Sequence, residues 1–113
     1  MKIQNSRNNA IISENGKYAI KFLDQALGLL LRSNPRSLLF KTRFGIHTLF
    51  LSHFIDVLII DDIFVVRQKK EQLSPFSFSF WNPTYKYVLE LPAGTIQKTD
   101  TQIGDTLIFD PPI

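Results

Sequence analysis

Cysteine is absent from this 113-residue chain. Its absence excludes disulfide bonds, thiol catalysis and metal sites built on thiolates. It does not indicate a cellular compartment, because a chain without cysteine folds in oxidising and reducing surroundings alike.

Long uninterrupted apolar runs are also absent. Residues 46–66 are the most hydrophobic stretch, but Asp56, Asp61 and Asp62 interrupt them. A charged Asp near the centre of a bilayer costs roughly 3 kcal/mol, so we predict no transmembrane span. The first 17 residues contain no apolar segment of signal-peptide length. The sequence therefore predicts a cytoplasmic protein, and a secreted domain trimmed of its leader would look the same.

Dense charge of one sign is lacking as well. The net charge is +3, and the basic residues are scattered, apart from one short cluster at residues 67–70. A nucleic-acid footprint needs a denser basic stripe, so no nucleic-acid partner is predicted. The chain contains neither of the glycine-rich phosphate-binding motifs nor the G-x-S-x-G nucleophile elbow. These absences argue against nucleotide-dependent enzymes and common serine hydrolases, and no cofactor is expected.

The size and composition predict one globular domain. Hydrophobic residues make up 44% of the chain and charged residues 20%, an ordinary globular balance. The polar, Asn-rich residues 1–9 are predicted to be a disordered tail, and residues 10–113 a single compact domain. The spacing of Leu23, Leu27 and Leu30 predicts a short helix over residues 23–32. Asn15-Gly16 suits a type I′ turn, which predicts a hairpin between residues 10–13 and 17–22.

Further strands are predicted along the rest of the chain. They cover residues 37–43, 46–51, 56–61, 64–70, 87–91 and 105–110, with a short helical turn or loop at 94–99. Short links between strands favour antiparallel pairing. The predicted fold class is therefore α+β, β-rich, with a mostly antiparallel curled sheet or small open barrel and one short helix near residues 23–32.

The histidines give little support for a metal site. His47 and His53 are the only two, and on one extended strand they would lie about 20 Å apart. No metal site is predicted. His47 is interpreted as a strand residue bonded to backbone, and His53 as a turn residue.

Two carboxylates occur where apolar residues surround them. Asp56 comes just before a strand with apolar residues on both faces, which predicts that the strand is buried on both sides. The Asp56 carboxylate is therefore either a structural group whose oxygens accept hydrogen bonds from backbone N–H groups, or an acid in a small polar pocket. Glu90 is either an outward-facing strand residue or part of a pocket mouth shared with Asp56, Thr48 and His47. If the two carboxylates lay close together, the pKa of one would be raised, as in acid–base sites.

An aromatic segment follows at residues 75–85. Phe76, Phe78 and Phe80 alternate with serines, which predicts a strand. If the Phe face is internal, these rings are core. If it is exposed, Phe76, Phe78, Phe80 and Trp81 form an interface for a partner or for a second copy of the chain.

Four segments together resemble one small family. They are LGLLLR at 27–32, SLLF at 37–40, GIHTLFLSHFIDVLIID at 45–61, and YVLELPAGTI with IGDTL between 87 and 107. Their order and spacing resemble the domain-of-unknown-function family 192, over roughly residues 18–109. The resemblance implies a compact α+β domain with no assigned activity or cofactor. The positions that match its motifs are Gly28, Arg32, Gly45, His47, Thr48, Asp56, Asp61, Glu90, Pro92, Gly94, Gly104 and Asp105.

The sequence departs from the family pattern at two positions. Leu31 stands where the pattern tends to have glycine, and Ile55 where it tends to have proline. The aromatic segment falls where the family varies.

Two functions follow from these residues. The favoured one is a non-enzymatic module that binds a protein or a small molecule, as a monomer or homodimer, with Thr48, Asp56 and Glu90 as ligand-binding candidates. The alternative is a small hydrolase or lyase that uses Asp56 as general acid or base, with His47, Thr48 and Glu90 around it. The binding module is favoured because the sequence shows no complete set of nucleophile, base and orienting residue.

Overall fold

The structure, a computed structural model, describes residues 1–19, 37–41, 46–47, 54–74, 78–79, 82 and 84–113. Its elements are β1 (Lys2–Asn5), β2 (Ile11–Ser13), β3 (Lys17–Ala19), β4 (Leu38–Lys41), β5 (Ile46–His47), β6 (Ile55–Ile60), β7 (Val66–Leu73), β8 (Phe78–Ser79), β9 (Tyr87–Pro92), α2 (Thr95–Thr99) and β10 (Leu107–Asp110).

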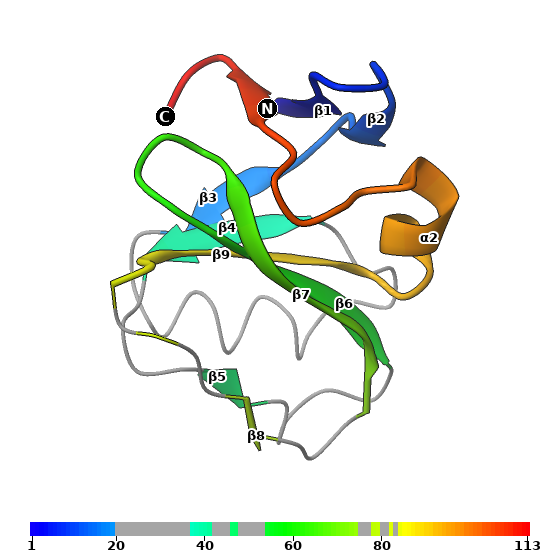
Figure 1. Ribbon diagram of the computed structural model, residues 1–113, viewed down its shortest axis with the longest axis vertical. Coiled ribbons are helices and arrows are strands. Elements are labelled where there is room, and N and C mark those ends of the chain that lie inside the picture. Colours follow the sequence, from blue (N-terminus) through cyan, green and yellow to red (C-terminus); the bar gives the residue numbers. More distant parts are fainter. Residues whose placement is uncertain (20–36, 42–45, 48–53, 75–77, 80–81, 83) are drawn as a thin grey trace.

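The strands of the described residues form three sheets. A five-stranded sheet has the order β3-β4-β9-β6-β7, a three-stranded sheet has the order β10-β1-β2, and β5 pairs with β8. All pairings are antiparallel except β3 with β4. The three-stranded sheet lies on one side of the five-stranded sheet and the β5–β8 pair on the other, with α2 beside the first of these layers (Figure 1).

The predicted fold class is confirmed: the protein is a β-rich, mostly antiparallel α+β domain. The short helical turn predicted at residues 94–99 is α2. The helix predicted at residues 23–32 lies outside the described residues.

Strand β6 runs through the middle of the core. All six of its residues are buried, as the apolar residues at both parities predict. Leu58 and Ile60 join a cluster that fills the space between the two larger sheets, together with Ile3 and Phe109. Ile55, Val57 and Ile59 face the opposite side of the five-stranded sheet, together with Leu38 and Val88. The sheet therefore has two buried faces.

The amino-terminal residues differ from the sequence prediction. Residues 1–9 were expected to be a disordered tail, but β1 is the central strand of the three-stranded sheet. Ile3 is fully buried opposite Phe109. The prediction was wrong because β10, which supplies the partner of β1, is about a hundred residues away in the sequence. Local composition does not reveal such a pairing.

The hairpin predicted around Asn15-Gly16 was also wrong. β2 pairs with β1, whereas β3 pairs with β4 in another sheet. A type I′ turn needs a positive φ at both central residues, and neither Asn15 nor Gly16 has one. Gly16 instead allows a close approach, because a Cβ atom there would lie 2.8 Å from Cδ1 of Ile3. Its amide also donates to the carbonyl oxygen of Met1.

Candidate functional site

Asp56 is fully buried at the start of β6. Its Oδ1 accepts a hydrogen bond from the backbone N–H of Gln72 at 2.9 Å, and its Oδ2 accepts one from the N–H of Ile96 at 2.8 Å. Gln72 lies in a bulge of β7, where the register with β6 shifts and the backbone adopts φ 53°. Such a bulge turns an amide out of the regular ladder.

The second bond of Asp56 is at the start of α2. The residue before the helix, Gly94, has a left-handed backbone and offers no side-chain cap. The first amides of a helix have no partner within the helix, and Asp56 supplies one from a distant strand. The Asp56 carboxylate therefore joins β6, the β7 bulge and α2, as expected from the structural interpretation of this residue.

Glu90 lies in the middle of the five-stranded sheet. It is on β9, directly opposite Leu38 of β4 and Val57 of β6. The residue is only 3% exposed. Within the described part of the chain, no donor or acceptor hydrogen-bonds to its Oε2 atom. Burial of the carboxyl raises the pKa of Glu90 to about 8, because a low-dielectric environment disfavours the charged form.

Asp56 and Glu90 point to opposite faces of the sheet. Asp56 is opposite Leu91, which belongs to the cluster between the sheets. Glu90 is opposite Val57, which belongs to the cluster on the other face. Residues directly opposite in a ladder share a face, and successive residues alternate. The structure therefore does not bring the two carboxylates into one pocket, and Glu90 does not face outward into solvent either.

The other candidates from the sequence lie mostly outside the described residues. Thr48 and the positions of Phe76, Phe80 and Trp81 are among these. The backbone of His47 is described: it pairs with Phe78 in the β5–β8 ladder. That ladder lies on the side of the five-stranded sheet that Glu90 faces (Figure 1).

Asp61 organises the turn between β6 and β7. Its Oδ1 accepts the amides of Ile63 and Val65, and its Oδ2 accepts Nε of Arg67 at 2.7 Å. Partial burial acts to raise the pKa of Asp61, but these bonds outweigh it and lower the pKa. Asp61 is thus a turn residue.

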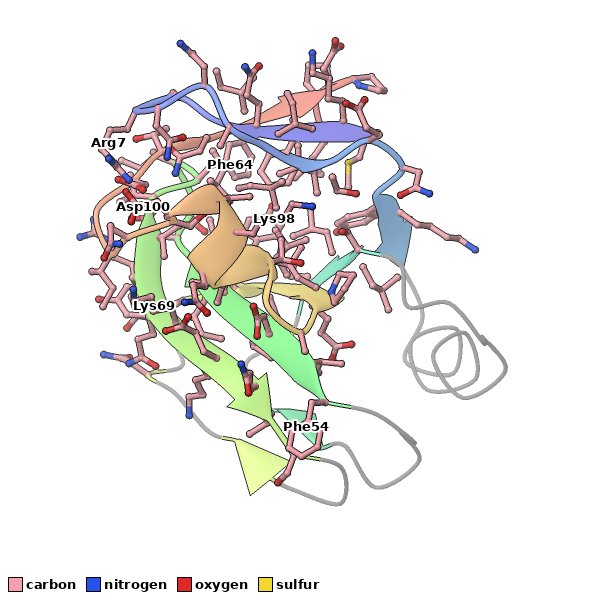
Figure 2. The ribbon with its side chains drawn as sticks, turned by 90° about the vertical axis from the view of Figure 1, so that its right-hand side faces the viewer. Arg7, Phe54, Phe64, Lys69, Lys98 and Asp100 are labelled. Carbon is pink, nitrogen blue, oxygen red and sulfur yellow. The ribbon has the colours of Figure 1, made fainter. Side chains whose placement is uncertain are left out.

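Asp105 holds the amino-terminal segment against the loop before β10. Its carboxylate accepts bonds from Nε of Arg7 at 2.7 Å, Nδ2 of Asn5 at 2.7 Å and the amide of Gln102 at 2.8 Å. Burial acts to raise the pKa of Asp105, but the bonds from Arg7, Asn5 and Gln102 lower it below the ordinary value. Arg7 also bonds to Asp100, and the two side chains lie together at one end of the molecule (Figure 2). No local pattern in the sequence indicates this cluster, because Asn5 and Arg7 lie 100 and 98 residues from Asp105.

No group of three or more metal-ligating side chains occurs among the described residues. In the same part of the chain, no helix is long and apolar enough to cross a membrane.

Of the four sequence motifs, LGLLLR at 27–32 lies outside the described residues, and the other three are described wholly or in part. Residues 3–109 match the model of the family DUF192, described as "Uncharacterized ACR". The chain belongs to the DUF192 family. The resemblance seen in the sequence is thereby confirmed over nearly the whole chain. No protein with a curated description matches this DUF192 chain.

Two solved structures share the DUF192 protein's fold. One is a candidate transcription regulator from Sinorhizobium meliloti, with a TM-score of 0.75 and 21% identity, over 95% of this chain and 89% of that one. The other is a protein of unknown function from Novosphingobium aromaticivorans, with a TM-score of 0.75 and 13% identity, over 96% of this chain and 82% of that one. At these identities the likeness shows the fold alone.

The acidic residues of the family motifs differ in the hydrogen bonds that their carboxylates accept. Asp56, Asp61 and Asp105 each accept at least two hydrogen bonds that hold a turn, bulge or loop. Glu90 differs, because its Oε2 has no partner among the described residues. The sequence contains one indication that Glu90 is buried. Val88, Leu89 and Leu91 place apolar side chains on both faces of the strand, so Glu90 would be buried whichever face it points to.

Proposed function

We propose that this DUF192 protein is a non-enzymatic module that binds a small molecule, with Glu90 as the polar group that anchors it. The observation that carries the proposal is the Glu90 carboxyl, 3% exposed on an apolar sheet face, with Oε2 unpartnered among the described residues. A buried polar atom without a partner costs about 1–3 kcal/mol. Such an atom needs an explanation, and a ligand that pairs with it removes the cost.

The surroundings of Glu90 fit the usual composition of a ligand site. Small-molecule sites are mainly apolar, with a few polar groups that fix the orientation of the ligand. Leu38 and Val57 flank Glu90 across the sheet, and Val88 precedes it on the same face of β9.

The enzyme hypothesis has less support. It requires Asp56 as a free acid or base beside Glu90 and His47. Both oxygens of Asp56 accept backbone amides, and its carboxylate is on the opposite face from Glu90. A general base must lie within reach of the proton that it removes, and a carboxylate committed to holding two backbone segments is poorly suited to that role.

The description of the Sinorhizobium meliloti protein as a candidate regulator gives no separate support for DNA binding here. The net charge of +3 is spread over the sequence, whereas DNA-binding surfaces concentrate basic residues.

Retention of small molecules from a metabolite extract tests the proposal. The purified protein is incubated with the extract and washed by ultrafiltration, and the retained compounds are identified by mass spectrometry. We compare the native chain with Glu90→Leu, which replaces the carboxyl-bearing side chain by an apolar one of similar size. Glu71→Gln is the control, because Glu71 is exposed on β7.

At least one compound is expected to be retained by the native chain and by Glu71→Gln, and to be absent from Glu90→Leu. Equal retention by all three proteins, or no retention by any, would contradict the proposal. Circular dichroism confirms that Glu90→Leu is folded.

A further inference from the structure

The link between β2 and β3 contains the single Asn-Gly dipeptide of the sequence, Asn15-Gly16. Asparagine before glycine is the least hindered setting for attack of the following backbone nitrogen on the side-chain amide, because glycine has no Cβ atom. Asn15 is exposed, whereas Gly16 is buried. The two reacting groups therefore lie at the boundary between solvent and the packed amino-terminal sheet.

The structure restrains the nucleophile of this reaction, the backbone nitrogen of Gly16. Its N–H donates to the carbonyl oxygen of Met1 at 2.8 Å, and the nitrogen of Met1 donates to the carbonyl oxygen of Gly16 at 2.7 Å. Ile3 covers the same glycine, since a Cβ atom there would lie 2.8 Å from Cδ1 of Ile3. The Gly16 nitrogen must lose its proton and approach Cγ of Asn15 in order to react, so its bond to Met1 must open first.

The other asparagines are less suited to this reaction. Asn34 and Asn82 precede proline, which has no N–H to lose. Both side-chain polar atoms of Asn5 and of Asn8 take part in hydrogen bonds. Asn9 is followed by alanine, whose Cβ atom hinders the attack.

We propose that Asn15 is the deamidation site of this chain and that the pairing of Met1 with Gly16 controls its rate. When the pairing opens, the Gly16 nitrogen loses its proton and forms a bond to Cγ of Asn15. The Cγ–Nδ2 bond breaks, and the amide group takes up a proton and leaves as ammonia. Water then opens the succinimide ring at either of its two carbonyl carbons, giving aspartate or isoaspartate at position 15.

The isoaspartate product does not fit the native packing. It inserts one methylene group into the backbone just before Gly16, where the contact with Ile3 leaves too little room even for a Cβ atom. The Met1–Gly16 pairing therefore cannot re-form unless β1 moves. Deamidation at Asn15 thus marks chains in which this pairing has opened.

Peptide mapping by mass spectrometry measures the rate of deamidation at each asparagine and distinguishes isoaspartate from aspartate. The native chain is incubated at pH 8, folded in buffer and unfolded in concentrated urea. Deamidation is expected first at Asn15, with both isomers among the products. The folded chain should react about tenfold more slowly than the unfolded chain, because the two hydrogen bonds between Met1 and Gly16 oppose the opening.

Ile3→Val tests the role of the packing over Gly16, because it removes Cδ1 and keeps a β-branched apolar side chain in the core. In the folded state, this variant should deamidate at Asn15 about threefold to tenfold faster than the native chain, the size expected for a buried Ile-to-Val change. Ile108→Val is the matched control, since Ile108 is exposed on β10 of the same sheet, and it should react like the native chain. In urea the three chains should react at one rate.

Equal rates for the folded and the unfolded native chain would overturn the proposal, and this comparison depends on no variant. Equal rates for folded Ile3→Val and the folded native chain would overturn it too, once circular dichroism confirms that the variant is folded. Faster deamidation at another asparagine would contradict the assignment to Asn15. Aspartate without isoaspartate at position 15 would indicate direct hydrolysis and contradict the attack by Gly16.

Discussion

Replacement of Glu90 by Gln should change how the stability of the protein depends on pH. In the folded chain, burial raises the pKa of Glu90 from 4.5 to about 8. In the unfolded chain the side chain is in water and ionises near its ordinary value. Between pH 4.5 and 8, folding therefore takes up a proton, and raising the pH favours the unfolded state.

The size of the effect follows from the pKa interval. Each pH unit within it lowers the free energy of unfolding by about 1.4 kcal/mol. The native chain should thus lose roughly 5 kcal/mol between pH 4.5 and pH 8, and no more above pH 8 from this group. Small domains are stable by only about 5–15 kcal/mol, so the loss is a large share of the total.

Urea unfolding followed by circular dichroism at pH 5 to 9 measures this difference. Glu90→Gln does not titrate, so its advantage over the native chain should grow steadily up to pH 8 and then level off. The amide of the Glu90→Gln variant itself raises or lowers the free energy of unfolding, but by the same amount at every pH, so the change of the difference with pH is unaffected. His47 and His53 are present in both proteins, and Glu71→Gln shows the effect of losing an exposed carboxylate.

A difference between the native chain and Glu90→Gln that stays within about 1 kcal/mol from pH 5 to pH 8.5 would refute the reasoning. It would mean that Glu90 ionises normally in the folded chain, either because water reaches it or because a cation pairs with it.

Three other substitutions test how the remaining motif residues act. Asp56→Ala should cost about 3 kcal/mol or more in urea unfolding, because it leaves the amides of Gln72 and Ile96 without their acceptor; a cost under 1 kcal/mol would show that these bonds do not hold the bulge and α2. Asp105→Asn should make the stability less dependent on pH below about 4. The pKa of Asp105 is lower in the folded chain than the ordinary value of 3.8, so the ionised carboxylate stabilises the fold above pH 3.8, and this stability is lost as the pH falls through the folded pKa. Acid unfolding that is the same for both proteins would contradict this account. Gly104→Ala should cost about 1 kcal/mol through backbone strain alone, because Gly104 has φ +96° and no atom lies within 4 Å of the added methyl group; a neutral result in thermal unfolding would show that the turn relaxes.

Asp56 shows how far local reasoning from the sequence reaches. Its position before a strand with apolar residues on both faces leaves two interpretations, a carboxylate that accepts backbone amides or an acid in a polar pocket, and its two oxygens accept backbone amides. The sequence did not identify the amides of Gln72 and Ile96, which are 16 and 40 residues away. A carboxylate in an apolar setting needs donors, but which ones it meets depends on how the chain folds back.

Glu90 shows the opposite case. Its apolar neighbours on both faces imply burial, yet it was interpreted as outward-facing or as a partner of Asp56. Only the register of β9 against β6 shows that Glu90 is opposite Val57, and Asp56 is opposite Leu91. A shift of one residue would have placed both carboxylates on one face.

The sequence by itself determined the β-rich class, the strands from β6 onward, the burial of β6 on both faces and the family. These follow from local patterns of apolar residues and from motif spacing. The tertiary structure decided the place of β1 between β10 and β2, the parallel pairing of β3 with β4, and the separation of Asp56 from Glu90 by the sheet. Pairings between distant segments depend on which strands meet and in what register, and no single stretch of sequence contains that information.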